Sequence, residues 1–576
     1  MSFKPLLTVA LILASCSDPA SSPPLTQAPT LEAAETVFTN GQVYTVDAAS
    51  SWAQAVAVRN GEIVYVGDDR GAQAYVGANS ITVDLGGRMM MPAFQDSHIH
   101  PISSGVEAAQ CDLNGLDDLD AYRRTILDYA SANPELDWIT GGGWSMSVFG
   151  PGGAPSKAFI DDLVPDRPVY LVSQDGHTGW ANSRALELAG IDRNTADPVD
   201  GVIDRDPLTG DVLGSLQEGA MSLVSRLVPP VSVEDRIRGL EYSRDLLHGY
   251  GITSFTDASV RRDDLLAYRD LIERDELNMR VVASLRWDRN QGLEQVDTLQ
   301  ALRAEFEDGG LLRAGTVKIM QDGVMENYTA AMLEPYFIPS GSRGISMIEP
   351  ALLNQIVSEL DRVGFQVHFH AIGDRAIRES LDSIAAARAN NGASGLRHHI
   401  SHLQIIHPDD FSRFAELEVI ANFQPVWAYN DAYVTELTVP FIGEDRAQWM
   451  YPMKSIEDAG GMIAFGSDWS VTTANPFPQI ETAVTRLPPG GDTVPVMQPE
   501  ERLSLESALV AFTRNAAYLN GQEDRTGSIE VGKLADLIVL DRNLFEIDPA
   551  EISETSVLLT LFAGTPVHGS LDDLKE

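Results

Sequence analysis

Short apolar runs alternate with longer stretches of mixed polarity through the centre of the chain. Eight of these runs have the length and composition of buried β-strands: residues 88–100, 251–257, 280–287, 316–322, 365–371, 398–404, 419–426 and 462–469. Strands that alternate with helical stretches form parallel sheets. The pattern predicts an α/β fold with a TIM-like (β/α)8 barrel over residues 89–499.

The two ends of the chain follow a different pattern. Residues 37–66 and 527–567 contain short β-rich runs, and Asn60-Gly61 marks a hairpin turn in the first of them. Two β-rich flanks around an α/β centre predict one small β-sandwich domain built from both ends, residues 36–88 and 500–576.

A long insertion is expected after the first barrel strand. The gap before the second strand is longer than one helix requires, so residues of about 106–245 should lie over the barrel mouth. Within them, residues 138–144 and 168–177 are strand-like.

The N-terminus has the pattern of a targeting signal. Residues 6–14 are apolar but too few to span a bilayer, and Leu13-Ala14-Ser15-Cys16 resembles the lipobox of bacterial lipoproteins. The pattern predicts a signal peptide over residues 1–16, a flexible tether over 17–35, and lipidation of Cys16 as the only membrane attachment. We expect a cell-envelope location, at the outer membrane or in the periplasm. An ordinary cleaved signal with an incidental cysteine is the alternative.

Composition narrows the range of partners. The 576 residues carry a net charge of −42, from 41 basic and 83 acidic residues. Such a surface repels phosphate backbones, which argues against a nucleic-acid partner and leaves a small-molecule substrate. Cys111 is the only other cysteine, so a lipidated Cys16 excludes an internal disulfide. The sequence leaves open whether the chain forms a homo-oligomer.

The candidate chemistry is a set of histidines at strand ends. Successive side chains of a strand point to opposite faces, so His98 and His100 share one face and suit a divalent metal. Seven of the eleven histidines fall in three strand-like segments: His98, His100, His368, His370, His398, His399 and His402. In barrels of this kind, the active site lies at the carboxyl ends of the strands.

Several longer motifs carry a family resemblance. They are MPAFQDSHIH, GHTGWANSRAL, LTGDVLGSLQEGA, GITSFTD, VKIMQDG, TAAMLEPY, HFHAIGDRA, HHISHLQ, FGSDWSV and VGKLADLIVLD, in this order along the chain. In these motifs the chain resembles the amidohydrolase superfamily. The resemblance is to the amidohydrolase 3 type, the branch of metal-dependent hydrolases that includes N-substituted formamide deformylase.

The resemblance implies a metal centre with named ligands. By motif position they are His98, His100, Lys318, His370, His402 and Asp468. It further implies two divalent ions, zinc by default, with Lys318 N6-carboxylated as a bridging ligand. Asp468 would take a proton from the metal-activated water, and His177 would hold the developing oxyanion.

The expected activity is hydrolysis of a C–N bond other than a peptide bond: an amide, N-formyl or N-acyl group on a small apolar or aromatic substrate. We expect the substrate to contact Trp144, His177, Trp180, Tyr328 and Trp469. The chain departs from the family at His399 and Ser401, and residues 324–330 also look atypical, which suggests an altered pocket wall.

Three alternatives stay open. A mononuclear deaminase on the same fold would use one metal and no carboxylated lysine, so metal stoichiometry separates it. An esterase or lactonase would use the same site with an oxygen leaving group, and only substrate profiling separates it. A non-enzymatic metal-binding lipoprotein would need neither Asp468 nor an open coordination position.

Overall fold

The computed structural model describes Met1 and residues 32–150, 153–307, 310–491 and 494–575. The expected signal peptide apart from Met1, its lipidation residue Cys16 and most of the expected tether lie outside the described residues. Among the helices that are described, none is both long and apolar enough to cross a membrane.

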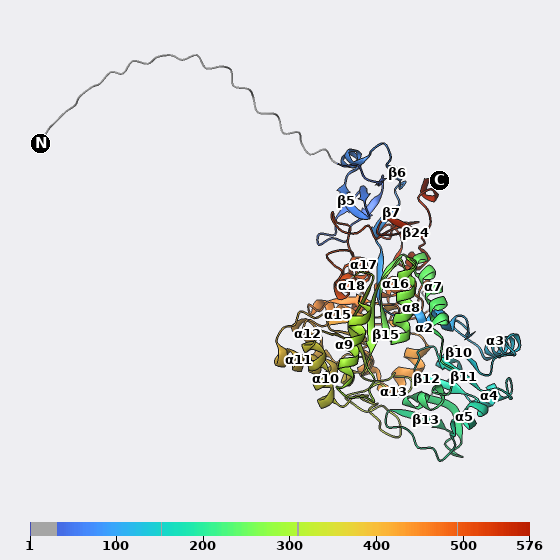
Figure 1. The fold of residues 1–576 in the computed structure, drawn as a ribbon. Helices are drawn as coiled ribbons and strands as arrows, with labels where there is room; N and C mark the ends of the chain where they lie inside the picture. The colour runs from blue at the N-terminus through green and yellow to red at the C-terminus, as the bar shows by residue number, and fades with distance from the viewer. Residues whose placement is uncertain (2–31, 151–152, 308–309, 492–493, 576) are drawn as a thin grey trace.

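Eight parallel strands form a nearly closed barrel, as the sequence predicts (Figure 1). Each strand pairs with the next along the chain: β8 (Phe94–Ile99), β15 (Ile252–Val260), β16 (Arg280–Arg286), β17 (Leu312–Met320), β18 (Gln366–Ala371), β19 (His399–His402), β20 (Ile420–Phe423) and β21 (Ile463–Phe465). At the seam between β21 and β8, the Ser97 hydroxyl donates to the Phe465 carbonyl at 2.6 Å. The Asn422 side-chain amide donates to the Ser97 carbonyl at 2.9 Å. Side-chain hydrogen bonds therefore help to close the ring.

The first predicted strand, residues 88–100, is two strands. β7 (Met89–Pro92) pairs with β22 (Leu537–Leu540) in a sheet made from the chain ends, whereas β8 belongs to the barrel. The change of partner falls between two residues: the Ala93 N–H donates to the Asp536 carbonyl, and the Phe94 N–H donates to the Gly251 carbonyl in the barrel. Both strands are buried, so the run is apolar throughout and its pattern does not reveal the break.

Helices cover the outside of the barrel (Figure 1). They are α2 (Pro101–Glu107), α7 (Val233–Gly249), α8 (Arg262–Glu273), α9 (Gln295–Phe306), α10 (Pro350–Arg362), α11 (Asp374–Asn391), α12 (Phe411–Glu416), α15 (Met453–Asp458), α16 (Pro476–Thr485), α17 (Leu505–Phe512) and α18 (Arg514–Leu519). Each of the longer helices turns one apolar face inward, where residues such as Leu265, Leu353 and Ile377 join the barrel core. Local capping sets their starts: the Ser232 side chain accepts from the Asp235 N–H at the start of α7.

Two further sheets are built from the ends of the chain: one is entirely N-terminal, and the other contains strands from both ends. One has the order β5-β4-β1-β6 and the other β24-β23-β22-β7-β2-β3. The strands not yet named are β1 (Thr36–Thr39), β2 (Gln42–Tyr44), β3 (Trp52–Ala53), β4 (Ala55–Arg59), β5 (Glu62–Gly67), β6 (Ile81–Asp84), β23 (Val557–Phe562) and β24 (Thr565–His568). One apolar cluster joins them, with Phe38 and Val56 from the N-terminal segment and Leu537 and Leu561 from the C-terminal segment. In Figure 1 these sheets lie together at one end of the barrel.

A third sheet forms within the segment between β8 and β15. Its order is β13-β14-β12-β11-β10-β9. The strands are β9 (Cys111–Asp112), β10 (Ile139–Trp144), β11 (Val169–Ser173), β12 (Thr178–Ala181), β13 (Gly201–Arg205) and β14 (Val212–Glu218), and the helices α3 (Leu119–Ala132), α4 (Lys157–Asp161), α5 (Ser183–Ala189) and α6 (Ser222–Ser225) accompany them. Figure 1 shows this unit on the side of the barrel away from the terminal sheets. The insertion therefore has its own sheet and apolar core.

Candidate active site

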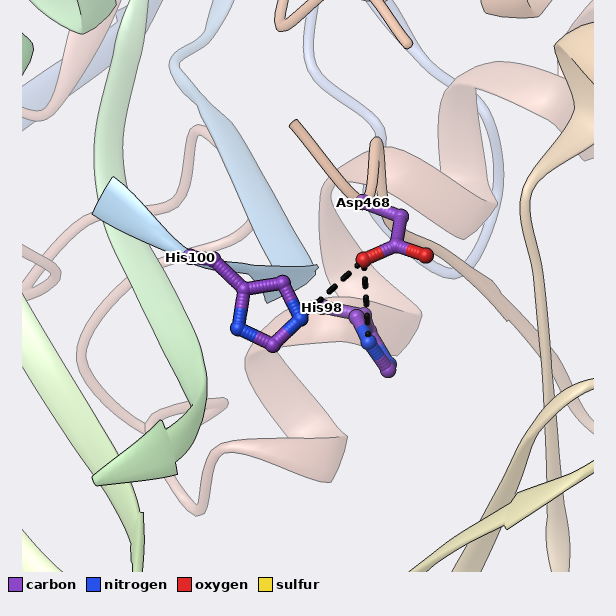
Figure 2. Close-up of side chains that lie close together, drawn as sticks. All are labelled: His98, His100 and Asp468. Atoms are coloured by element: carbon purple, nitrogen blue, oxygen red, sulfur yellow. Dashed lines mark ion pairs between the residues drawn. The ribbon is translucent and has the colours of Figure 1, made fainter. Parts of the chain in front are cut away.

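His98 and His100 converge on the carboxylate of Asp468. The two histidines come from the end of β8, and Asp468 follows β21. The Nε2 atoms of His98 and His100 lie 3.4 and 3.2 Å from the Asp468 Oδ1 atom, and Figure 2 shows both rings beside that carboxylate. That oxygen is buried and has no hydrogen-bond partner among the described residues. A carboxylate oxygen held this way between two imidazoles suits a divalent cation.

Lys318 lies on β17 beside this cluster. Its side chain is buried, and its Nζ atom lies 3.4 Å from the His98 Nε2 atom. Burial lowers the pKa of Lys318 to about 7, against the opposing effect of Asp468. A large fraction of the amine is therefore neutral near pH 7, and the neutral amine is the form that can react with CO₂.

His370 on β18 and His402 at the end of β19 complete the group. Their ring centroids are 4.6 Å apart, and His402 is also 4.6 Å from the ring of His98. Burial lowers the pKa of His370 and His402 well below the usual value, which keeps both rings in the neutral form that binds metals. The His402 Nδ1 atom is buried without a hydrogen-bond partner among the described residues. These donors fit a metal centre.

Two buried aspartates position the ligands. Asp96 accepts hydrogen bonds from the backbone N–H groups of His98 and Ser467, which ties the end of β8 to the loop after β21. Asp322 accepts from three backbone N–H groups, and its Oδ1 atom lies 3.3 Å from the Nδ1 atom of His370. A carboxylate behind an imidazole fixes the orientation of the ring, so the opposite ring nitrogen can face the cavity.

His177 reaches the site from the insertion. Its Nδ1 atom lies 2.9 Å from the Glu218 Oε1 atom, and its ring centroid is 5.0 Å from that of His370. Burial lowers the pKa of His177, but Glu218 and Asp175 outweigh burial and raise it to about 9. Glu218 also accepts from the Thr329 hydroxyl at 3.0 Å. The ion pair with Glu218 thus favours the imidazolium form of His177 and leaves its Nε2–H group for another acceptor.

Glu218 was not among the residues expected from the sequence. It is the last residue of β14 and lies in LTGDVLGSLQEGA, one of the motifs that carry the family resemblance. The only sequence signal for a role of Glu218 was the presence of its carboxylate within a motif shared with the family. Its partner is 41 residues away in the sequence, so only the pairing of β14 with β12 reveals the contact.

His399 and Ser401, where the chain departs from the family, lie away from the cavity lining. The Ser401 hydroxyl is 2.8 Å from the His368 Nε2 atom, and the rings of His368 and His399 are 4.1 Å apart. All three side chains are fully buried. His368 is thus a buried core histidine that does not line the cavity.

Trp144 and Trp180, expected to contact substrate, are core residues of the insertion. Both are 0% exposed, and their rings meet edge to face with centroids 5.9 Å apart. The indole N–H groups donate to the backbone carbonyls of Leu171 and Ser156. The prediction was wrong. Alternation along a strand shows which residues share one face of a sheet, but it does not show which face of the insertion sheet meets the cavity.

Tyr328 and Trp469 are also outside the cavity lining. Tyr328 packs against Tyr336 and Phe441 with ring centroids 5.6 and 4.9 Å away. Trp469 lies against Tyr242 at 6.5 Å. Both residues follow barrel strands as expected, but the loops that carry them direct the rings toward neighbouring side chains and away from the cavity.

A cavity of about 860 Å³ lies over the cluster. Its lining includes every ligand that the resemblance implied together with the insertion histidine: His98, His100, His177, Lys318, His370, His402 and Asp468. The aromatic lining comes from Trp427, Tyr429, Tyr433 and Tyr451, and Trp427 stacks on His402 at 5.5 Å. The atypical segment 324–330 contributes Val324 and Glu326 to the wall.

Comparison with known proteins identifies the family of this chain. The model of the amidohydrolase family matches residues 82–568. The chain is 32% identical to protein LONG AFTER FAR-RED 3 of Arabidopsis thaliana, over 93% of this chain and 92% of that one. It is 28% identical to the N-substituted formamide deformylase of Arthrobacter pascens, over 91% and 96% of the two chains.

A solved structure of a metal-dependent hydrolase from Pyrococcus furiosus superposes with a TM-score of 0.67 at 26% identity, covering 89% of this chain and 99% of the other. The fold, the converging donor side chains and the match over most of the chain all support the same family assignment. The chain belongs to the amidohydrolase family and is a hydrolase.

Proposed function

We propose that this protein is a metal-dependent amidohydrolase that cleaves the C–N bond of an amide, N-formyl or N-acyl compound. The observation that carries the proposal is the buried Asp468 oxygen held between His98 and His100 at the cavity wall. A carboxylate in that position can both bind a metal and take a proton from water. The likeness to an N-substituted formamide deformylase supports a C–N bond as the target.

The reaction needs one proton to move from water to nitrogen. A divalent metal, when bound, polarises the carbonyl and lowers the pKa of water. Asp468 accepts the proton of the attacking water as the new C–O bond forms, and it returns that proton to the leaving nitrogen as the C–N bond breaks. His177, cationic through its ion pair with Glu218, donates a hydrogen bond to the carbonyl oxygen as negative charge develops there.

For the metal centre, we favour two zinc ions with Lys318 N6-carboxylated. The support is the burial of Lys318 and its lowered pKa, together with a donor set of imidazoles and carboxylate that suits zinc. A mononuclear deaminase remains the second candidate, because the tightest donor group is only His98, His100 and Asp468.

Substrate profiling tests the activity. Metal-replete protein is assayed against matched amide, carbamate, ester and amine substrates, with Asp468→Asn as the inactive control. We expect hydrolysis of the amides, and about 10²- to 10⁴-fold slower turnover in the variant, because an amide side chain cannot accept the proton. Turnover of the ester alone, or ammonia release from the amine alone, would replace this proposal by the esterase or the deaminase.

We also propose attachment to the cell envelope through lipidated Cys16, supported by the lipobox-like run Leu13–Cys16 alone. In a Gram-negative host, the wild type should incorporate labelled fatty acid and sediment with membranes, and Cys16→Ser should do neither. Soluble, unlabelled wild-type protein would contradict the lipid anchor.

A further inference from the structure

Arg286 brings an unneutralised positive charge into the cavity. It is the last residue of β16, lines the cavity, and its Cα pairs in register with that of Lys318 on β17. Residues in register on neighbouring strands point to the same face of a sheet. The Arg286 side chain therefore leaves the barrel on the same side as Lys318.

No hydrogen bond or ion pair reaches the Arg286 guanidinium from the residues that the structure describes. Its side chain is exposed, and the surface it exposes is part of the cavity wall. Two other arginines of the wall are paired: Arg289 with Asp200 at 2.6 Å, and Arg236 with Asp264 at 2.5 Å. Arg286 is the member of this group whose N–H donors are left for a ligand.

The charges around Arg286 do not offset its own. Desolvation by the surrounding protein, with Arg261 and Arg289 nearby, lowers the pKa of Arg286 to about 10, and Asp288 acts weakly in the opposite direction. The guanidinium is still protonated at pH 7. An anion beside it would relieve the repulsion among the three arginines.

The cavity also has an acidic region. Burial raises the pKa of Glu326 to about 7, and the neighbouring Asp175 and Asp431 add to that rise. All three residues line the cavity. An anionic group would be repelled there, so the charge distribution assigns it to the region of Arg286.

We propose that Arg286 binds a carboxylate of the substrate, which makes the substrate an amide or N-acyl compound that carries a carboxylate group. This inference rests on the proposed function for the position of the scissile bond, which lies by Asp468 and Lys318. A single unpaired guanidinium presents a fork of N–H donors that matches a carboxylate in geometry and charge. A phosphate would call for further free cations, and Arg236 and Arg289 are already paired with aspartates. The aromatic side chains of the lining would hold the apolar part of the same substrate.

A matched pair of formamides tests the carboxylate preference. N-formylphenylalanine and N-formylphenethylamine share the formyl group and the benzyl group and differ in the carboxylate. We expect kcat/KM to be at least about tenfold higher for the acid in the wild type. In Arg286→Gln the acid-to-neutral ratio should fall by about 10- to 100-fold, mainly through KM, as expected for a lost charge-assisted pair. Arg286→Lys should give an intermediate ratio because it keeps the charge but lacks the fork.

Arg262→Gln is the matched control. Arg262 is an exposed residue of α8 paired with Glu305, so its replacement removes the same charge from outside the cavity. The acid-to-neutral ratio should stay within about twofold of wild type. An equal fall in both variants would mean that net charge, and not Arg286, attracts the acid, and it would overturn the proposal.

A binding measurement separates this inference from the proposed activity. Calorimetry on metal-replete protein compares 3-phenylpropionate with 3-phenylpropan-1-ol in the wild type and in Arg286→Gln. Binding of the acid that weakens at least about tenfold in the variant supports the carboxylate site even if no amide is hydrolysed, in which case only the proposed function fails. Amide hydrolysis with an acid-to-neutral ratio that Arg286→Gln leaves unchanged would keep the function and overturn the carboxylate site.

Discussion

The Nδ1 atom of His177 lies 2.9 Å from the Oε1 atom of Glu218, and both side chains are buried at the junction of the insertion with the barrel. The ion pair fixes which ring nitrogen faces the cavity and keeps the ring charged despite burial. The insertion thus contributes His177 and Glu218 to the lining of the same cavity as the candidate metal ligands.

Replacing Glu218 should impair turnover through His177. In Glu218→Gln, burial acts on His177 without the ion pair, so the ring becomes neutral and donates a weaker hydrogen bond to the oxyanion. We expect kcat to fall about 10- to 100-fold with little change in KM, as for an interaction made mainly in the transition state. Steady-state kinetics measure this split. Glu218→Asp, which keeps the charge, should recover part of kcat. A Glu218→Gln variant with a raised KM and an unchanged kcat would assign Glu218 to substrate binding.

Lys318 should control the number of metal ions. Lys318→Ala removes the side chain that a carbamate would require, so metal content should fall from close to two ions per chain toward one, with loss of activity. Plasma emission spectroscopy on dialysed protein gives the stoichiometry. Wild-type protein with one ion, or an active Lys318→Ala variant, would favour the mononuclear deaminase.

Trp180 should contribute to stability and not to specificity. Trp180→Ala leaves a cavity in a fully buried cluster, at a cost of about 3–5 kcal/mol to the insertion. Thermal unfolding followed by tryptophan fluorescence and limited proteolysis of the insertion measure the loss. Leu188→Ala, at an exposed position of α5, is the control and should change stability by less than about 0.5 kcal/mol. A substrate-dependent KM effect in a stably folded Trp180→Ala would restore the earlier pocket assignment.

Asp361 should make part of the free energy of unfolding of this protein depend on pH. Burial raises the pKa of Asp361, but hydrogen bonds from His398, Ser394 and Asn391 outweigh burial and lower it well below its usual value. A carboxyl group with a lowered pKa in the folded state adds stability that is complete above its unfolded pKa of about 3.9 and is lost as pH falls below that value.

The test compares Asp361→Asn with wild type across the acid range. At pH 7 the variant should be about 1–3 kcal/mol less stable, because it loses charge-assisted bonds in a buried site. The difference in Tm should shrink as pH falls from 5 to 3, and because it is a difference, any loss of metal common to both proteins cancels. A difference that stays constant over this range would assign the effect to packing and not to the ionised carboxylate.

Local patterns in the sequence were enough to locate the barrel strands, and its motifs were enough to name the candidate ligands. Buried strands leave apolar runs of strand length, so all eight barrel strands were located from local pattern. His98, His100, His370 and His402 end such strands, and parallel strands bring their carboxyl ends to one face. Each of these inferences needs only information within a few residues or within one motif.

Contacts between distant segments of the chain could be learned only from the three-dimensional structure. The pairing of His177 with Glu218 and the burial of Trp144 and Trp180 follow from how the insertion sheet is assembled. The Arg286 guanidinium has no partner among the residues that the structure describes, whereas the neighbouring Arg289 is paired with Asp200. These outcomes are set by side-chain direction and by competition for partners far away in the chain, and neither leaves a periodic signal in the sequence.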